Sequence, residues 1–303
     1  MLEKKITLLI TCLQAMRPHH IAKNILLLFP LLVGHHYLDL TSVKKSIIGF
    51  LVFCLLASST YIINDLIDLE HDRQHPIKKK RPLAAGQLSL VTGFSLACVL
   101  LGGAFMLSLY LPRSFLVVAA SYYLSTVLYS LVVKQKKWLD IIWLAALYCL
   151  RMMAGMTLVK QGYSLWLIVF TFCFFLGLAC LKRYVELADF FIVAKTAKLM
   201  VPGRAYRLVD RNRLFCLGQL NTFFSFLTVL GYIYSDKVQL IYKNPSWLWL
   251  VCPCLLFWIK RLWCLARQGK ITEDPVLFTL QDKVSWFIFV LIALIMSYAA
   301  WVA

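Results

Sequence analysis

Long apolar stretches alternate with short polar segments along the whole chain. A helix needs about 20 consecutive, mostly apolar residues to cross the roughly 30 Å hydrocarbon core of a bilayer. Nine stretches approach this length, and most are apolar on every side of a helix, as segments surrounded by lipid should be. They are Ile21–Tyr37, Ser46–Ile63, Leu88–Leu111, Ser114–Val133, Trp138–Val159, Tyr163–Leu181, Leu214–Ser235, Pro245–Cys264 and Val284–Ala303. The pattern predicts an all-α, polytopic membrane protein with nine transmembrane helices.

The first twenty residues have a different pattern. Residues 1–5 are basic and residues 6–16 are apolar, so the start of the chain superficially resembles a signal peptide. The sequence RPHH at residues 17–20 follows in place of a small-residue cleavage site. We therefore expect an interfacial amphipathic helix over about residues 1–20, leading into a single integral membrane domain that occupies residues 1–303.

Composition supports this class of protein and excludes others. Residues of the AVILMFWYC set make up 61% of the chain and charged residues 15%, against about 45–50% and about 25% in soluble proteins. A soluble fold could not bury this much apolar surface, and a disordered chain would show the opposite bias. The ten cysteines include no CxxC pair and no cluster with zinc-ligand spacing, so we interpret them as small apolar packing residues.

The positive charge indicates an orientation in the membrane. The formal net charge is +18, and with the N-terminus in the cytoplasm 25 of the 32 Lys and Arg residues fall in cytoplasmic segments. The positive-inside rule favours this arrangement, which places the C-terminus outside the cell membrane. Because the basic residues are spread over five segments with no recognisable nucleic-acid-binding module, we expect the lipid bilayer and no nucleic acid as a partner.

The acidic residues are scarcer and more informative. Asp65, Asp68 and Asp72 follow the second apolar stretch with the spacing i, i+3 and i+7, which places three carboxylates on one face of a helix. Like charges beside a bilayer require a compensating cation, and hard oxygen ligands suit Mg²⁺. The alternative is a solvated helix end that is neutralised by the basic residues 73 and 78–81.

The basic loop that follows these acids would complete a diphosphate site. It contains the run of cations at residues 78–81 and is stiffened by Pro76 and Pro82. A metal ion held by carboxylates neutralises a diphosphate leaving group, while Lys and Arg side chains bind its outer oxygens. We therefore expect cytoplasmic active-site loops over about residues 64–87 and 182–213.

The sequence resembles the UbiA superfamily of intramembrane prenyltransferases. The resemblance rests first on the motif NDxxDxxxD at residues 64–72 and on its continuation RPLAAG at residues 81–86. It extends through the middle of the chain, at Tyr129-Ser130, Lys134, Asp140, Arg151 and Gly155. The resemblance implies a UbiA-type nine-helix bundle with a lateral opening to lipid.

Two further segments resemble the decaprenyl-phosphate phosphoribosyltransferase branch of this superfamily. They are RPHHIAKN at residues 17–24, where Ile21 replaces the usual aromatic residue, and KRYVEL at residues 182–187. Other branches carry a second aspartate-rich motif after the sixth span, where this chain offers Glu186 and Asp189. The branch implies phosphoribosyl pyrophosphate as the donor, a polyprenyl phosphate as the acceptor, and Mg²⁺ as the cofactor.

The resemblance also implies a set of site residues. Asp65, Asp68 and Asp72 would be the catalytic Mg²⁺ ligands, which promote departure of diphosphate from the ribose C1 carbon while the lipid phosphate attacks. The residues that would bind substrate phosphates or line the second motif are Arg17, Lys23, Asn24, Asn64, Arg81, Tyr129, Lys134, Arg151, Lys182, Arg183, Tyr184 and Glu186.

Three other functions compete with this one. Within the superfamily, the chain could join a polyprenyl diphosphate to an aromatic acceptor, as in quinone or haem pathways. An anion or lipid transporter would place ionisable residues near the middle of the bilayer, whereas most of the acids here gather at one face. A non-catalytic lipid-binding scaffold would tolerate replacement of Asp65 and Asp68. The sequence leaves the prenyl chain length, the pathway and the oligomeric state open.

Overall fold

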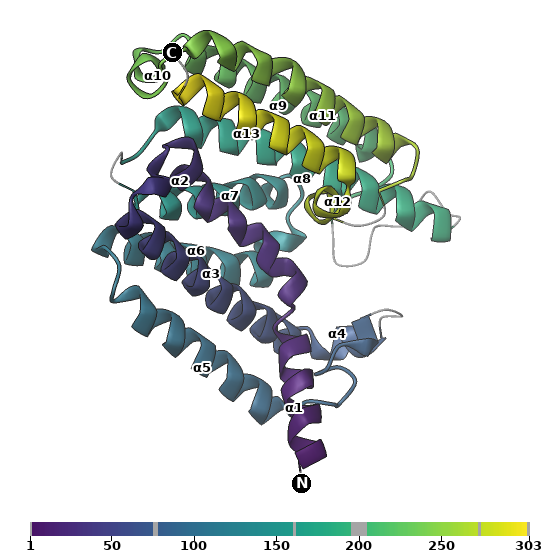
Figure 1. The fold of residues 1–303 in the computed structure, drawn as a ribbon. Coiled ribbons are helices and arrows are strands. Elements are labelled where there is room, and N and C mark those ends of the chain that lie inside the picture. The colour runs from purple at the N-terminus through teal and green to yellow at the C-terminus, as the bar shows by residue number, and fades with distance from the viewer. Residues whose placement is uncertain (1, 75–77, 160–161, 195–204, 272–273, 302–303) are drawn as a thin grey trace. The chain divides into compact units, whose positions relative to one another are not determined.

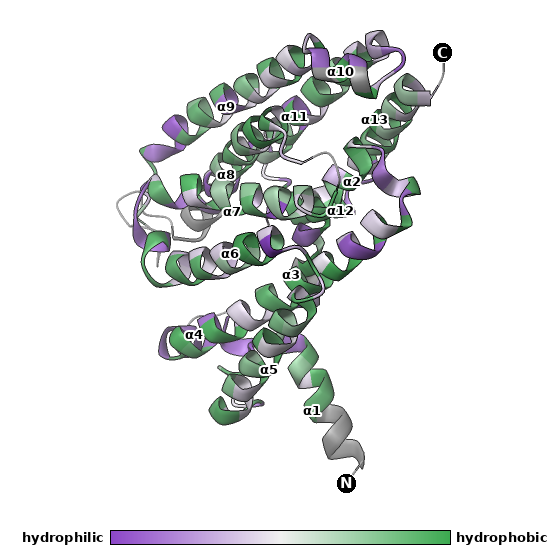
Figure 2. Ribbon diagram, turned by 90° about the vertical axis from the view of Figure 1, so that its left-hand side faces the viewer, coloured by the Kyte–Doolittle hydropathy of each residue, from purple (hydrophilic) through white to green (hydrophobic). Residues whose placement is uncertain are grey.

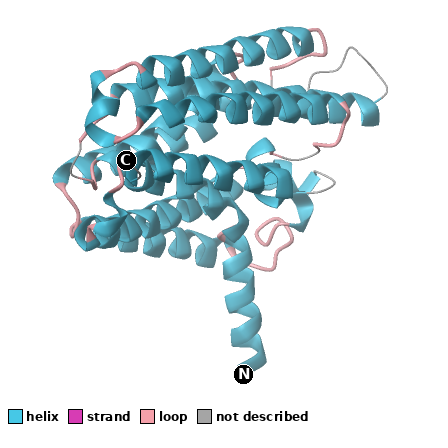
Figure 3. Ribbon diagram, turned by 45° about the horizontal axis from the view of Figure 1, so that its top comes forward, coloured by secondary structure: helices cyan, strands magenta, loops and turns pink. Residues whose placement is uncertain are grey.

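The structure, a computed structural model, describes residues 2–74, 78–159, 162–194, 205–271 and 274–301. All of the regular structure in these ranges is helical, as Figure 3 shows. The chain divides into two compact units, of which the first contains Met1–Leu131 and Leu150–Tyr163 and the second contains Val132–Cys149 and Ser164–Ala303. The all-α fold class expected from the sequence is confirmed.

The first unit is built around its longest helix, α3, which packs against α5, α6 and the 3₁₀ helix η1 (Figure 1). The buried residues Ala15, Ile62, Leu83, Leu88, Ala97 and Leu100 form one apolar cluster on this helix. The helices of the unit are α1 (Leu2–Ala15), η1 (Pro18–Leu28), α2 (Phe29–Val33), η2 (His36–Leu38), α3 (Leu40–Ile67), α4 (Leu69–Gln74), η3 (Lys78–Lys80), α5 (Leu90–Ser108) and α6 (Arg113–Leu131).

The second unit is built on α8 and α9, which pack along each other. Close approach of α11 to α9 requires a glycine, because a Cβ atom at Gly218 would lie 2.2 Å from Cζ2 of Trp263. The helices of this unit are η4 (Val133–Gln135), α8 (Leu165–Ala194), α9 (Asp210–Ile233), α10 (Asp236–Ile241), η5 (Pro245–Leu250), α11 (Val251–Arg267), α12 (Pro275–Gln281) and α13 (Lys283–Trp301). The helix α7 (Leu139–Met156) begins in this unit and ends in the first.

Polar residues placed at helix starts explain several of these boundaries. Asp39 accepts a hydrogen bond from the backbone N–H of Thr41 at the start of α3, and Ser89 accepts one from Thr92 at the start of α5. A side-chain oxygen in this position satisfies a backbone donor that the first helical turn leaves without a partner. The sequence thus marks where these two long helices begin.

Among the residues that the structure describes, eight helices are long and apolar enough to cross a membrane by length and composition. Hydrophobic residues cover most of their length, as Figure 2 shows. The ninth stretch expected from the sequence, Ile21–Tyr37, contains the shorter apolar helix Ile21–Val33. Its helix ends where His35 adopts a left-handed backbone conformation with φ of 54°, so it is shorter than the apolar pattern. The predicted N-terminal helix corresponds to α1, and its place at a membrane surface stays a prediction.

The two segments expected as active-site loops are partly helical, which corrects the sequence-based expectation. Residues 182–194 continue α8, where an ion pair between Arg183 and Glu186, one turn apart, supports the helix. In the first segment, α4 and η3 occupy much of the range 64–87. Residues 195–204 lie outside the described residues. The acids of the first segment are therefore placed by α3, α4 and the junction between them, whereas Arg81 lies in the turn that follows η3.

Candidate active site

The acidic motif lies at the junction of α3 and α4 in the first unit. Its helix α3 ends at Ile67, and Asp68 is the C-terminal cap. The backbone N–H of Asp68 donates to the carbonyl of Asn64 at 2.9 Å, and that of Asp72 donates to the carbonyl of Asp68 at 2.8 Å. The junction therefore preserves helical spacing. Asp65 and Asp72 are buried, with 3% and 1% of their surface exposed, whereas Asp68 is half-buried.

Two arginines neutralise this pair of buried carboxylates. The Nη1 atom of Arg81 lies 3.0 Å from Oδ1 of Asp65 and 2.5 Å from Oδ2 of Asp72, so one guanidinium nitrogen bridges both acids. Arg17 forms a second ion pair with Asp65. Nζ of Lys78 lies 3.9 Å from Oδ1 of Asp72. Because buried charges are stable only when they are paired, the two acids and the two arginines depend on one another.

Local packing places both arginines at the acids. Arg81 opens a turn that is held by backbone hydrogen bonds from Ala85 to its carbonyl and from Leu88 to the carbonyl of Pro82. Leu83, which has 2% exposure, and Leu88 anchor this turn in the apolar cluster on α3. Arg17 occupies the bend between α1 and η1 with a left-handed φ of 51°. The carboxylates therefore face cations that come from two separate turns.

The donor set suits a hard divalent cation. Oδ1 of Asp72 is buried and accepts no hydrogen bond in the structure, so it retains a lone pair that a metal ion could use. Asp65 and Asp72 already face a common positive group in Arg81. Within the part of the chain that the structure describes, no three His, Cys, Asp or Glu side chains converge as metal ligands. The two buried acids fit Mg²⁺, and the three-carboxylate site stays a prediction.

A second polar cluster in the first unit joins two residues that the sequence had singled out. Nε of Arg151 donates to Oδ1 of Asn24 at 3.1 Å, and its Nη2 donates to the hydroxyl of Tyr122 at 2.7 Å. The Cζ atom of Arg151 also lies 4.7 Å from the centre of the Tyr122 ring. All three side chains are buried. A charge within a membrane span is costly, and these contacts reduce that cost.

A close backbone contact positions Arg151. A Cβ atom at Gly155 would lie 2.1 Å from the carbonyl oxygen of Leu27, so α7 meets η1 where a side chain cannot fit. Asn24 is one turn earlier on η1, and Arg151 is one turn earlier on α7. Glycine at this position therefore brings Arg151 within hydrogen-bond distance of Asn24.

Four other residues that the sequence predicts to bind phosphate are half-buried, and each lies on a different element. Lys23 lies on η1, Asn64 on α3, Tyr129 on α6 and Lys134 on η4. The first three belong to the first unit and Lys134 belongs to the second. Their roles toward phosphates stay predictions.

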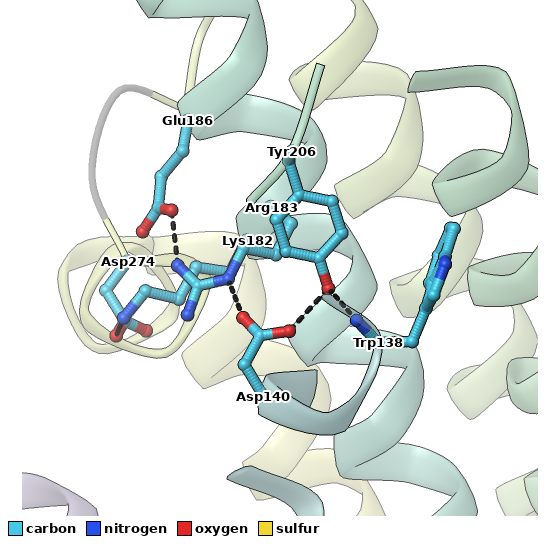
Figure 4. A network of polar contacts seen from close by, with 7 residues as sticks. All are labelled: Trp138, Asp140, Lys182, Arg183, Glu186, Tyr206 and Asp274. Carbon is cyan, nitrogen blue, oxygen red and sulfur yellow. Dashed lines mark hydrogen bonds and ion pairs between the residues drawn. The ribbon is translucent and has the colours of Figure 1, made fainter. Parts of the chain in front are cut away.

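Three residues of the segment KRYVEL, Lys182, Arg183 and Glu186, belong to a network of polar contacts in the second unit (Figure 4). Asp140 is fully buried and accepts a hydrogen bond from Nε of Arg183 at 2.7 Å. Its other oxygen accepts from the hydroxyl of Tyr206, which in turn accepts from the backbone N–H of Trp138 at 3.0 Å. Arg183, with 1% exposure, also pairs with Glu186. The Arg183 charge is thus held between two carboxylates.

The neighbouring Lys182 is also paired with a carboxylate. Its Nζ atom lies 2.8 Å from Oδ2 of Asp274, whose other oxygen caps α12 by accepting from the N–H of Val276 at 3.0 Å. Figure 4 shows both cations facing acids from other elements. Tyr184 instead accepts a hydrogen bond from Nη2 of Arg211 at 3.0 Å. The proposed phosphate ligands of this segment are therefore engaged within the protein, and their binding role stays a prediction.

Tyr206 keeps its proton in this network. Burial raises the pKa of its hydroxyl well above the usual range, and the Asp140 charge and their mutual hydrogen bond raise it further. The phenol is therefore protonated near neutral pH and donates to Asp140. Sequence reasoning missed Tyr206, because it lies 66 residues from Asp140 and carries no motif. Asp140 had a signal, since it is the only acid of its apolar stretch.

We compared the sequence and the fold with those of known proteins. Residues 27–280 match the UbiA prenyltransferase family. The chain is 36% identical to the uncharacterized protein y4nM of Sinorhizobium fredii, over 93% of this chain and 54% of that protein. It is 30% identical to the nodulation protein NoeC of Azorhizobium caulinodans, over 90% and 87%. A decaprenyl-phosphate phosphoribosyltransferase of Mycolicibacterium smegmatis is 34% identical over 58% of this chain and 56% of the enzyme.

The chain therefore spans about half the length of y4nM and of the phosphoribosyltransferase that it matches. A solved UbiA homologue from Archaeoglobus fulgidus, bound to DMAPP and Mg²⁺, has a TM-score of 0.71 and 14% identity, over 97% of this chain and all of that one. At this identity, the likeness shows the fold. The resemblance inferred from the motif at residues 64–72 is confirmed, as is its implication of a family of transferases. The chain is an integral membrane protein and belongs to the UbiA prenyltransferase family.

Proposed function

We propose that the protein is a Mg²⁺-dependent intramembrane transferase, which moves the phosphoribosyl group of phosphoribosyl pyrophosphate to a polyprenyl phosphate and releases diphosphate. The observation that carries this proposal is the pair of buried carboxylates, Asp65 and Asp72, facing Arg17 and Arg81. Acids that can bind a metal beside cations that can bind phosphate oxygens are the components that diphosphate chemistry requires.

Asp65 and Asp72 would hold the metal, with Asp68 as a further ligand. When bound there, Mg²⁺ supplies positive charge that stabilises the departing diphosphate. Arg81 and Arg17 neutralise the acids in the structure, and we propose that they donate to the outer phosphate oxygens when substrate is present. The guanidinium fork suits this role, since it binds phosphate through two parallel hydrogen bonds.

The proposed reaction is a displacement at the ribose C1 carbon. The bond between C1 and the diphosphate oxygen breaks, and its electron pair leaves with diphosphate. An oxygen of the lipid phosphate attacks the opposite face of C1 and forms the new bond. A phosphate monoester has a second pKa of about 6 and is already ionised near neutrality, so the reaction requires no strong general base. The protein's contribution is to orient the acceptor and to stabilise charge in the transition state.

The choice of donor is supported by sequence more than by geometry. The segments at residues 17–24 and 182–187 resemble the phosphoribosyltransferase branch, and the partial match to the Mycolicibacterium smegmatis enzyme points the same way. A donor with a 5-phosphate as well as a diphosphate needs more cations than one metal cluster supplies. On the resemblance, we propose that Lys23, Lys134, Arg151, Lys182 and Arg183 supply these cations. The uncharged residues Asn24, Asn64, Tyr129 and Tyr184 would contribute hydrogen bonds, and Glu186 would line the second motif.

We further propose that the site opens to the cytoplasm at the cell membrane, with the N-terminus inside and the C-terminus outside. The bias of 25 among 32 basic residues toward alternate polar segments supports this orientation. Asp65, Asp72 and Arg81 lie where α3 leaves its apolar stretch, so they would meet soluble and lipid substrates at the same membrane surface.

A second candidate is the transfer of a prenyl group from a polyprenyl diphosphate to an aromatic acceptor. It is favoured by the description of the family and by the solved homologue bound to DMAPP. The same acidic pair would serve it, because both donors lose a diphosphate.

Transfer from labelled donors separates the two candidates. Protein in liposomes is incubated with labelled phosphoribosyl pyrophosphate and polyprenyl phosphate, and the lipid extract is resolved by thin-layer chromatography. We expect label in the lipid fraction, its loss when EDTA removes divalent cations, and its recovery when Mg²⁺ is restored. Transfer of labelled prenyl groups to an aromatic acid, with no ribosyl transfer, would refute the first candidate.

The acidic pair is tested by Asp65→Asn and Asp72→Asn, each of which should lower the rate at least about 100-fold, since stabilisation of the developing charge is lost. Asp39→Asn is the matched control, because Asp39 caps the opposite end of the same helix and Asn caps equally well. Wild-type activity in both acidic variants would exclude the metal assignment.

A further inference from the structure

Three aromatic rings from different helices pack together in the second unit. They are Tyr184 on α8, Phe215 on α9 and Trp263 on α11. The ring centroids of Phe215 and Trp263 are 5.2 Å apart, and those of Tyr184 and Trp263 are 5.8 Å apart, with the rings edge to face in both pairs. Tyr184 and Trp263 are buried. The rings therefore form a rigid platform where the three helices meet.

Two arginines lie on this platform. The Cζ atom of Arg211 is 4.6 Å from the centre of the Tyr184 ring, and that of Arg267 is 5.7 Å from the centre of the Phe215 ring. Arg211 also donates a hydrogen bond from Nη2 to the Tyr184 hydroxyl. We call the five side chains, including Trp263, the Arg211–Arg267 surface.

Their charges are not compensated as those of their neighbours are. Lys182, Arg183, Lys137 and Arg261 each pair with a carboxylate in this unit. Neither Arg211 nor Arg267 pairs with any acid whose side chain the structure describes. An aromatic ring that stacks on a guanidinium fixes the orientation of that group. The ring does not neutralise the positive charge, and it leaves N–H donors at the edge of the guanidinium able to bind another group.

One donor of this surface is unsatisfied in a buried position. The Nε–H group of Arg211 is shielded from solvent and has no hydrogen-bond partner in the structure. Buried donors without an acceptor are rare, since each costs its full desolvation free energy. An anionic oxygen bound beside Tyr184 would accept a hydrogen bond from this Nε–H group and would also neutralise the charge of Arg211.

The position of the surface favours a ligand at the bilayer boundary. Arg211 is in the first turn of α9, and Arg267 is the last residue of α11. Both helices are among those long and apolar enough to cross a membrane. The ends of such helices lie at the depth of the lipid headgroups, where phosphate is the abundant anion.

We propose that the Arg211–Arg267 surface binds a phosphate group, and that it receives this group from a membrane lipid. The proposal goes beyond the transfer reaction, because it assigns phosphate binding to Arg211 and Arg267, which lie outside every motif that the sequence marks. A soluble phosphate compound offers the same chemistry to the two arginines, so the experiment must distinguish the two sources.

Binding is measured on delipidated protein in a neutral detergent by isothermal titration. The probes are inorganic phosphate, a short-chain phosphatidylglycerol, and a short-chain phosphatidylcholine, whose cationic headgroup neutralises the phosphate charge. We expect phosphatidylglycerol to bind more tightly than the other two. Arg211→Gln and Arg267→Gln should each weaken it at least about tenfold, since each removes charged hydrogen bonds. Arg213→Gln, an exposed residue of the same helix, is the control and should bind as the wild type does.

Each result decides the proposal. Binding of phosphatidylglycerol that depends on the two arginines supports a lipid ligand. If only inorganic phosphate binds in this way, the phosphate site is supported, but its ligand is a soluble compound and the lipid source is refuted. The site is refuted if the variant that combines Arg211→Gln with Arg267→Gln binds as tightly as the wild type, or if neither anion binds. Arg267 is exposed, so Arg267→Gln keeps the test valid if Arg211→Gln fails to fold. Because binding requires no turnover, a protein that transfers no phosphoribosyl group still tests this inference.

Discussion

Replacing Asp140 by Asn should destabilise the protein through the arginine that it leaves behind. Arg183 has 1% of its surface exposed and Asp140 has none, so the pair is shielded from solvent. Removing one partner of a buried ion pair costs about 3–5 kcal/mol, because the remaining charge is uncompensated. Glu186 stays within reach of Arg183 and is 35% exposed, which places the expected cost near the lower limit. We therefore expect Asp140→Asn to lower the free energy of unfolding by about 3 kcal/mol.

A double variant tests whether charge, rather than packing, is responsible. In Asp140→Leu/Arg183→Met both charges are replaced by apolar side chains, and such replacements are often neutral or stabilising. It should therefore be more stable than Asp140→Leu alone. Asp282→Asn is the comparison, because the pair of Arg261 and Asp282 is partly exposed, at 23% and 12%, and should contribute about 1 kcal/mol or less.

Reversible unfolding in mixed detergent and SDS micelles, followed by far-ultraviolet circular dichroism, measures these differences. The reasoning would be refuted if Asp140→Asn cost no more than Asp282→Asn. It would also fail if the double variant lost as much stability as its two single variants combined, since the charges would then act independently.

Two further perturbations test other parts of the structure with the same unfolding assay. Gly155→Ala places a methyl group against the carbonyl of Leu27 and should lower the free energy of unfolding by about 1–3 kcal/mol. Gly102→Ala is the control and should not lower it, because the space around Gly102 is open. Equal effects of the two substitutions would contradict the close contact at Gly155. Burial raises the pKa of Asp282, but the hydrogen bonds from Arg261 and Ser285 and the Arg261 charge outweigh it and hold the pKa below its usual range. The stability that this carboxylate contributes is thus present above the unfolded-state pKa of about 4 and is lost as the pH falls below it, so Asp282→Asn should unfold with a weaker acid dependence between about pH 5 and 3. An unchanged dependence would exclude this contribution.

Much of the fold could be predicted because the membrane imposes it. A helix that crosses lipid must satisfy its backbone internally and be apolar along about 20 residues, and both requirements are visible in one dimension. The start of α3 at Asp39 is likewise local, because a cap contacts only the next turn. The first apolar stretch departs from this prediction, because its helix ends near His35, where the backbone adopts a left-handed conformation. The sixth stretch also departs from it, because α8 continues past Leu181 to Ala194.

The acidic motif could also be predicted from the sequence, since the seven-residue spacing of Asp65 and Asp72 places both on one helical face, two turns apart. The burial of these two acids could not be predicted, because it depends on Arg81 and on Leu83 and Leu88, which anchor the Arg81 turn in the apolar cluster. Similarly, KRYVEL marked Lys182 and Arg183 as cations, yet nothing local shows that each faces a carboxylate.

The sequence by itself determined the class of protein, its family, the apolar helices and the place of the acidic motif. These features follow from hydropathy, residue spacing and motifs, each of which involves residues that are close together in the chain. Only the tertiary structure decided which charges are neutralised and which are left to bind other groups. Arg183 lies 43 residues from Asp140, and Arg211 meets Tyr184 across 27 residues. The binding capacity of a cation depends on the partners that packing brings to it, and such partners come from distant positions.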